Sequence, residues 1–171
     1  KAGISPERTD LLPGATFALA KIEKDRIAII QGGDCFALWI KTDGTSGITT
    51  NQLFHYDMET RRIIAALMKK HRGDRKEMWK EFAPILSDLR QTHVNREGRF
   101  GGYALLNGQD EVGNHWNLIT LRRSEISFLM FFTDGLIYYP ESGKPETLAR
   151  EILNNYQKGG LTEILKSTRR K

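Results

Sequence analysis

Two blocks of strand-like sequence, separated by the helical periodicity of residues 57–95, constrain the fold of this chain more than any other feature. Short apolar runs bounded by turn residues predict three strands on each side of the helical block. The predicted strands are residues 15–22, 26–30, 36–40, 102–106, 116–121 and 127–133. Strands, then a helical pair, then strands again are typical of an α+β fold with antiparallel sheets, in which the helical pair would cover a sheet face.

The helical block divides into two helices. Asp57 is predicted to cap the first helix and Gly73 to end it, whereas Asp74 begins the second. The second helix carries an apolar stripe that ends at His93, which is expected to pack in the core, and Pro84 is expected to kink or split this helix.

Turn signals and one further apolar stripe complete the element assignment. Asp43-Gly44 predicts a hairpin turn after the third strand. Residues 145–157 predict a final helix that stops at Gly159-Gly160 and buries one apolar stripe. The buried positions expected on that helix are Leu148, Ile152 and Tyr156.

Length and composition indicate the class of protein and its partners. The chain has 171 residues, which suits a single domain, with residues 1–12 and 166–171 expected to be peripheral. The formal net charge is +5, but four of the positive charges lie in the last six residues, which leaves 5 − 4 = +1 for the rest. A body so nearly neutral predicts no nucleic-acid partner, and the shortness of the apolar runs predicts no membrane partner. The single cysteine, Cys35, favours a reducing, cytoplasmic location.

Two carboxylates occur in the same setting, at the end of an apolar strand and beside a glycine. Asp34 follows Gly33, and Asp134 precedes Gly135 directly after the strand that ends at Thr133. A buried strand presents its terminal residue with little freedom, and carboxylate oxygens are the ligands that a hard cation such as Mg²⁺ or Mn²⁺ prefers. Gly-Asp and Asp-Gly are also common turn dipeptides, and either one alone is more often an ordinary turn than a metal site. The occurrence of both in the same setting is what favours a metal site.

Several segments in order resemble the metal-dependent, PP2C-like protein phosphatases of bacterial type. Residues 33–37, Gly-Asp-Cys-Phe-Ala, resemble the family's Gly-Asp-Ser-Arg-Ala turn, and residues 13–16 resemble the opening of the preceding strand. Residues 131–136, Phe-Phe-Thr-Asp-Gly-Leu, are similar to its Ser/Thr-Asp-Gly motif, and residues 101–107 also fit. The resemblance extends from about residue 13 to residue 160.

This resemblance implies a sandwich of two antiparallel sheets flanked by antiparallel helices. It also implies two or three Mn²⁺ or Mg²⁺ ions in the complete domain, and water-mediated hydrolysis of phosphoserine or phosphothreonine in a phosphorylated protein substrate, with a protein kinase as a possible partner. By motif, Asp134 would be a direct metal ligand, and Asp34 would lie nearby as a support or a ligand of a weaker site. Thr133, Gly135 and Gly33 would position the two carboxylates.

The sequence also departs from the family pattern. Nothing before Gly14 resembles the family's first acidic motifs, and its closing acidic motif does not follow the last helix. Cys35 and Phe36 stand where Ser and Arg are usual. We therefore expect a phosphatase domain that is incomplete at both ends of this chain. The alternative is a catalytically inactive, phosphatase-like binding or regulatory module.

Overall fold

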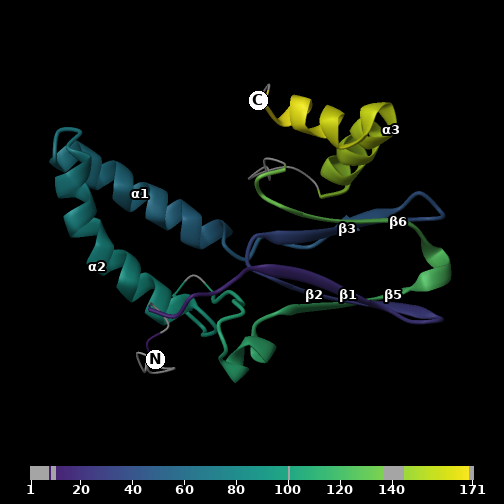
Figure 1. Ribbon diagram of the computed structural model, residues 1–171, viewed down its shortest axis with the longest axis horizontal. Coiled ribbons are helices and arrows are strands. Elements are labelled where there is room, and N and C mark those ends of the chain that lie inside the picture. The colour runs from purple at the N-terminus through teal and green to yellow at the C-terminus, as the bar shows by residue number, and fades with distance from the viewer. Residues whose placement is uncertain (1–7, 9–10, 100, 137–144, 170–171) are drawn as a thin grey trace. The chain divides into compact units, whose positions relative to one another are not determined.

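The computed structural model describes residues 8, 11–99, 101–136 and 145–169, which form two compact units (Figure 1). Lys1–Thr16 with Gln52–Trp116 form a helical unit, and Phe17–Asn51 with Asn117–Lys171 form a sheet unit. The predicted α+β class is confirmed. The expectation of one domain over residues 1–171 stays a prediction.

The sheet unit contains two three-stranded sheets in which all neighbouring strands are antiparallel. One sheet has the order β1 (Phe17–Ile22), β2 (Arg26–Gly32), β5 (Asn117–Arg122). The other has the order β4 (Ser46–Ile48), β3 (Cys35–Lys41), β6 (Ile126–Thr133). Each sheet therefore joins strands from before the helical unit to a strand that follows it.

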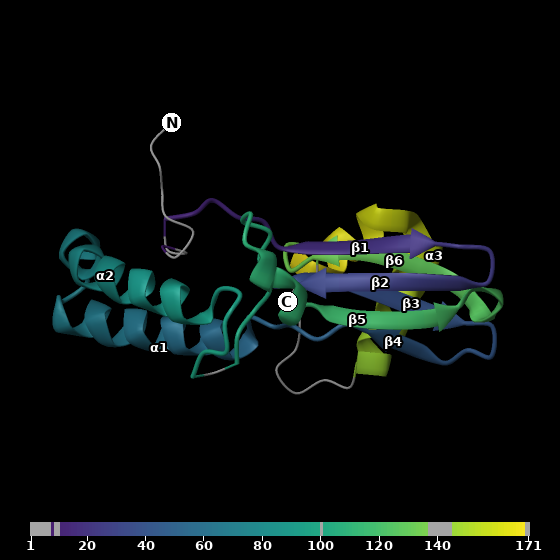
Figure 2. The same ribbon diagram turned by 90° about the horizontal axis from the view of Figure 1, so that it is seen from below.

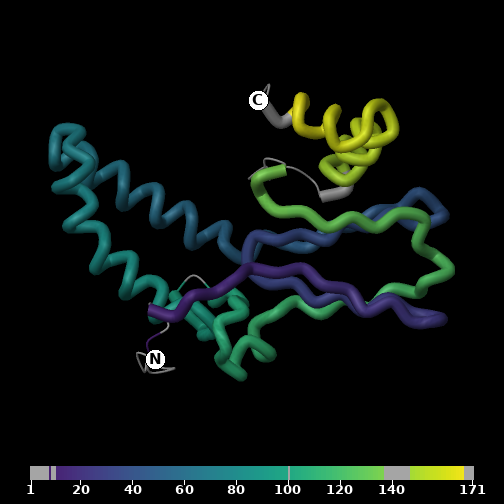
Figure 3. The backbone as a smooth tube through the Cα atoms, in the orientation of Figure 1, coloured from purple at the N-terminus to yellow at the C-terminus, as the bar shows by residue number. Residues whose placement is uncertain are grey.

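The sheet unit is built in three layers, sheet on sheet and then helix on sheet (Figure 1, Figure 3). Figure 2 looks onto the β1-β2-β5 sheet and shows its strands in that order. Ile29 of β2, Ala37 of β3 and Leu121 of β5 belong to one buried cluster, which fills the space between the two sheets. On its other face the β4-β3-β6 sheet packs against α3 (Pro145–Arg169), where Phe36 and Ile152 are buried together. Period-2 alternation along β3 supplies both faces, because successive side chains point to opposite sides of the sheet.

The helical unit is a hairpin of α1 (Phe54–Lys70) and α2 (Arg75–His93), followed by an irregular segment. Leu67, Met78 and Phe82 form the buried centre between the two helices. The irregular segment contains the short 3₁₀ helix η1 (Asp110–Asn114), and a second short 3₁₀ helix, η2 (Arg123–Glu125), joins β5 to β6 in the sheet unit. Within the described residues, no helix is both long enough and apolar enough to cross a membrane.

The helix boundaries confirm some predictions and correct others. Asp74 caps α2, because its carboxylate accepts hydrogen bonds from the backbone N–H groups of Lys76 and Glu77. The prediction that Asp57 caps α1 is wrong, since α1 begins at Phe54 and Asp57 lies in its first turn. Gly73, with a φ of 88°, follows the end of α1 and donates its N–H to the carbonyl of Met68.

The expectations for one helix end and one buried position differ from the structure, and of the two outcomes expected at Pro84 the split is excluded. Pro84 does not split α2, which is assigned as one helix from Arg75 to His93. The last helix breaks at Gly159 and Gly160 as predicted, but helical structure resumes and continues to Arg169. Tyr156 is 42% exposed rather than buried, although its ring contacts that of Phe128 on β6, with the ring centroids 5.6 Å apart.

The predicted strand at residues 102–106 is absent. Only isolated bridges occur there, between Tyr103 and Val94 and between Leu106 and Ala15. The side chain of Asn95 replaces a partner strand, because it accepts a hydrogen bond from the N–H of Leu105 and donates one to the Leu105 carbonyl. The apolar residues Tyr103, Ala104 and Leu105 are therefore buried although they form no β-strand.

Candidate functional site

The structure brings Asp34 and Asp134 to the same end of the β3–β6 pair. Cys35, the first residue of β3, is paired with Thr133, the last residue of β6, in an antiparallel ladder. Asp34 directly precedes Cys35, and Asp134 directly follows Thr133, so the two carboxylates flank the end of one ladder. We call Gly33, Asp34, Thr133, Asp134 and Gly135 the acidic edge.

Packing behind the acidic edge fixes the register that makes these residues neighbours. Phe36 and Phe132 are paired across the ladder, and their rings stack with centroids 5.4 Å apart. Both side chains belong to the core under α3, so a slip of one residue would turn them out of that core. The position of the carboxylates is therefore a consequence of core packing.

The two glycines of the acidic edge differ in what they do. Gly33 has a φ of 73°, a conformation that glycine adopts with little cost and that lets the chain turn directly into β3. Gly135 needs no such freedom on steric grounds, because a Cβ there would meet only the Thr133 hydroxyl, at 3.6 Å. The Asp134-Gly135 turn is closed instead by the N–H of Leu136, which donates to the Thr133 carbonyl.

Three hydrogen-bonded polar side chains, of which only Gln31 is buried, lead to the acidic edge, and the sequence analysis did not single them out. Gln31 is 0% exposed, and its Nε2 donates to the carbonyl oxygen of Gly33 at 2.9 Å. Asn117, its register partner on β5, donates from Nδ2 to Gln31 Oε1 at 2.7 Å and to Thr50 Oγ1 at 3.2 Å. We call Gln31, Asn117 and Thr50 the amide relay. The available signal was a glutamine that continues the inward-facing series of Ile27 and Ile29.

The acidic edge offers oxygen ligands of the kind that Mg²⁺ and Mn²⁺ prefer. These ions are commonly held by one or two carboxylates and keep several waters. Asp34 and Asp134 are therefore of the chemical type that such an ion takes as ligands. In the part of the chain that the structure describes, no three or more His, Cys, Asp or Glu side chains are grouped so that they could hold a metal.

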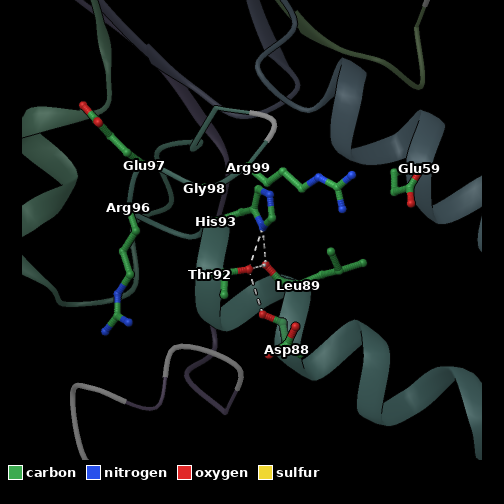
Figure 4. Close-up of a pocket in the computed structure, with 9 residues that line it drawn as sticks. All are labelled: Glu59, Asp88, Leu89, Thr92, His93, Arg96, Glu97, Gly98 and Arg99. Carbon is green, nitrogen blue, oxygen red and sulfur yellow. Dashed lines mark hydrogen bonds between the residues drawn. The ribbon is translucent and has the colours of Figure 1, made fainter.

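A separate pocket of about 530 Å³ lies in the helical unit, and Figure 4 shows the side chains that line it. Both signs of charge occur in its lining, on Glu59, Asp88, Glu97, Arg96 and Arg99. The side chain of Arg99 extends toward Glu59 (Figure 4). The hydrogen bond from Arg62 lowers the pKa of Glu59, and the charge of Arg99 acts in the same direction.

His93 forms part of the wall of this pocket. It is 2% exposed, which confirms the prediction that it packs in the core. Its Nδ1 lies 2.8 Å from the Leu89 carbonyl and 2.8 Å from the Thr92 hydroxyl (Figure 4). Because a carbonyl can only accept, the Leu89 contact assigns the proton of the neutral ring to Nδ1. Gly98 lies against the ring, so closely that a Cβ there would be 2.3 Å from the His93 Cδ2 atom.

The three tryptophans differ in burial. Trp39 is partly buried against the core between the sheets, where its ring also covers Gly47. Trp79 is 54% exposed, and Trp116 is 36% exposed. Of the three, Trp39 is the one that packs against a buried cluster.

Comparison of this chain with protein-family models, with curated proteins and with solved structures found no match. We therefore infer the function from the chemistry of the residues and from their geometry.

Proposed function

We propose that this chain is the core of a PP2C-like serine/threonine protein phosphatase that uses Mn²⁺ or Mg²⁺. The observation that carries the proposal is the pairing of Cys35 with Thr133, which makes Asp34 and Asp134 neighbours at one sheet end. Two motifs that resemble those of the family are separated by 100 residues in the sequence, from Asp34 to Asp134, and they meet in the fold. The stacked sheets with α3 outside them agree with the sandwich that this family would require.

In this proposal Asp134 and Asp34 hold the metal, and the chain's other residues keep these carboxylates in position. A bound divalent ion supplies a water that is activated as a nucleophile at neutral pH and a positive charge that stabilises the phosphoryl oxygens. Gly33 makes the turn that presents Asp34, and Thr133 closes the turn that presents Asp134. The remaining ligands of a site with two or three ions would be contributed by other carboxylates of the complete domain. A phosphorylated protein as substrate, a partner kinase and a cytoplasmic location belong to the same proposal.

The first test is hydrolysis of p-nitrophenyl phosphate by the full natural polypeptide, with Mn²⁺ and with EDTA. We expect Asp134→Asn to lower the Mn²⁺-dependent rate by roughly 100-fold, because metal-held charge stabilisation is worth several kcal/mol. The fold should be unchanged, as judged by circular dichroism, because Asp134 lies outside the buried core.

Asp25→Asn is the matched control, since Asp25 lies in the turn at the opposite end of β2. This variant should keep the full rate. Equal Mn²⁺-dependent rates in Asp134→Asn and the wild type would refute the phosphatase proposal.

A second candidate function, a binding or regulatory module without turnover, is favoured by the pocket of the helical unit. That pocket combines a buried histidine with side chains of both charges, which suits a ligand with both donors and acceptors. The same assay separates the two functions, because a pure binding module shows no EDTA-sensitive hydrolysis in the wild type.

A further inference from the structure

We propose that Gln31, held by Asn117, is the positioning residue of the acidic edge. Its amide fixes the carbonyl of Gly33 and thereby sets the direction in which Asp34 leaves β2. The inference concerns residues outside the family-like motifs, and its metal-binding part rests on the function proposed above.

The burial of Gln31 shows how strongly its position is determined. It has 0% exposure in a strand whose other inward-facing residues are Ile27 and Ile29. A primary amide in an apolar interior is costly unless its donors and acceptor are paired. Here Nε2 reaches the Gly33 carbonyl at 2.9 Å and Oε1 receives the Asn117 amide at 2.7 Å. Both ends of the side chain are therefore held, which leaves it one orientation.

Only one of these bonds is directed at the acidic edge. The Gly33 carbonyl belongs to the peptide unit that leads directly into Asp34, and Gly33 itself has a φ of 73°. Tethering this carbonyl fixes the rotation of that peptide plane. The orientation of this peptide sets the direction of the backbone at Asp34, and the pairing of β3 with β6 begins at the next residue, Cys35.

The amide relay also reaches the points where the chain passes between the two units. Thr50 lies just before the passage at Asn51–Gln52, and Asn117 lies just after the passage at Trp116–Asn117. The hydrogen bond from Asn117 Nδ2 to Thr50 Oγ1, at 3.2 Å, joins the two chain segments of the sheet unit that lead into and out of residues 52–116. Consequently the relay spans the end of β4, the start of β5 and the turn before Asp34.

The test is Gln31→Met, which keeps the length of the side chain and removes both hydrogen bonds. The matched control is Thr49→Val, which removes the buried hydroxyl that accepts from the Ala37 N–H but does not touch the turn. Amide hydrogen exchange at Asp34 and Cys35 is followed by NMR, and Mn²⁺ binding is measured by titration calorimetry. Asn117→Ala, which frees Gln31 Oε1, serves as the second variant if Gln31→Met does not fold.

We expect Gln31→Met to accelerate exchange at these two amides about 10-fold over Thr49→Val at matched global stability. Mn²⁺ binding should weaken about 10-fold or more, as when a group that orients a metal ligand is lost. Exchange equal to that of Thr49→Val overturns the inference. A wild type that binds no Mn²⁺ refutes the proposed function instead, and the exchange measurement then decides the positioning role alone.

Discussion

Asn95 illustrates how a single residue holds an irregular segment in place. It has a φ of 51°, in a region that asparagine tolerates better than most residues, and it is 1% exposed. Its side chain satisfies both backbone groups of Leu105 and also reaches Asn107 and Gln109. The loop that carries the pocket residues 96–99 begins at this point. The Asn95 side chain therefore makes the backbone hydrogen bonds of Leu105 that a neighbouring β-strand would otherwise make.

We expect Asn95→Ala to lower the free energy of unfolding by about 3 kcal/mol. The change leaves buried polar groups of the Leu105 backbone without their partners, and each such loss costs roughly 1–3 kcal/mol. It also forces alanine into a positive φ. Urea denaturation gives the difference, and Asn114→Ala, at an exposed position in η1, is the control that should change little. A stability loss no larger than that of the control would contradict this role.

The β1–β2 hairpin shows how one turn organises charges on an element. Glu23 accepts hydrogen bonds from Arg26 and Lys21, which lower its pKa to about 2 from an ordinary value of 4.5. A carboxylate with a depressed pKa stabilises the folded state above its unfolded pKa, and this contribution is lost as the pH falls from about 4.5 to about 2. Because the group is exposed, the effect on stability is small, and the titration itself is the sharper measurement.

We therefore expect the Glu23 carboxyl to titrate well below 4.5 by NMR, and to return toward that value in Arg26→Ala. High salt should shift it in the same direction, because exposed charge pairs are screened. An unchanged Glu23 titration midpoint in Arg26→Ala would show that the hydrogen bond from Arg26 does not lower the pKa of Glu23.

Sequence patterns predict the helix ends and turns that are determined by residues adjacent in the sequence. Asp74 caps α2 because the backbone N–H groups that donate to its carboxylate lie only two and three residues further on. The glycine pair breaks α3 because neither Gly159 nor Gly160 has a helical conformation. β4, only three residues long, was missed although the Asp43-Gly44 turn before it was predicted; Gly44 has a φ of 82°. The strand at 102–106 failed because Asn95, a residue from another segment, satisfies its backbone.

The candidate site divides in the same way. Asp34 and Asp134 were found because each carboxylate stands beside a glycine at the end of an apolar run, which is a local pattern. Gln31 and Asn117 were missed because their pairing spans 86 residues and depends on the register of β2 with β5. His93 could be assigned to a buried stripe from its spacing, but the approach of Gly98 to its ring could not.

At the scale of the whole molecule, the Gln52–Trp116 segment of the helical unit is an insertion between β4 and β5. The buried clusters of the sheet unit contain only residues of that unit. Thr50 and Asn117, the sheet-unit residues on either side of the inserted segment, are close together, because Asn117 Nδ2 donates to Thr50 Oγ1 at 3.2 Å. A short linker can therefore connect them. The sheet unit thus has its own buried core, and the two points at which the inserted segment leaves and re-enters it lie close together.

We expect replacement of residues 52–116 by a Gly-Ser linker of roughly five residues to leave the sheet unit folded, because loops of this length commonly join neighbouring strands. Cooperative thermal unfolding followed by circular dichroism is the measurement. Adding Ile29→Ala to the same shortened chain should lower its melting temperature, since Ile29 is wholly buried between the sheets. A shortened chain that shows no cooperative transition would mean that the helical unit is needed for the sheets to form.

The insertion also sets an order of events during synthesis on the ribosome. β2 and β3 emerge early, but their partners β5 and β6 follow only after the whole helical unit has been made. At about 5–20 residues per second, the roughly 100 residues from Phe36 to Phe132 take about 5–20 s to appear. During that interval β2 can pair only with β1, and β3 only with β4, so each sheet lacks its third strand. Early folding of the helical hairpin, whose contacts are local, shortens the loop that must then be closed.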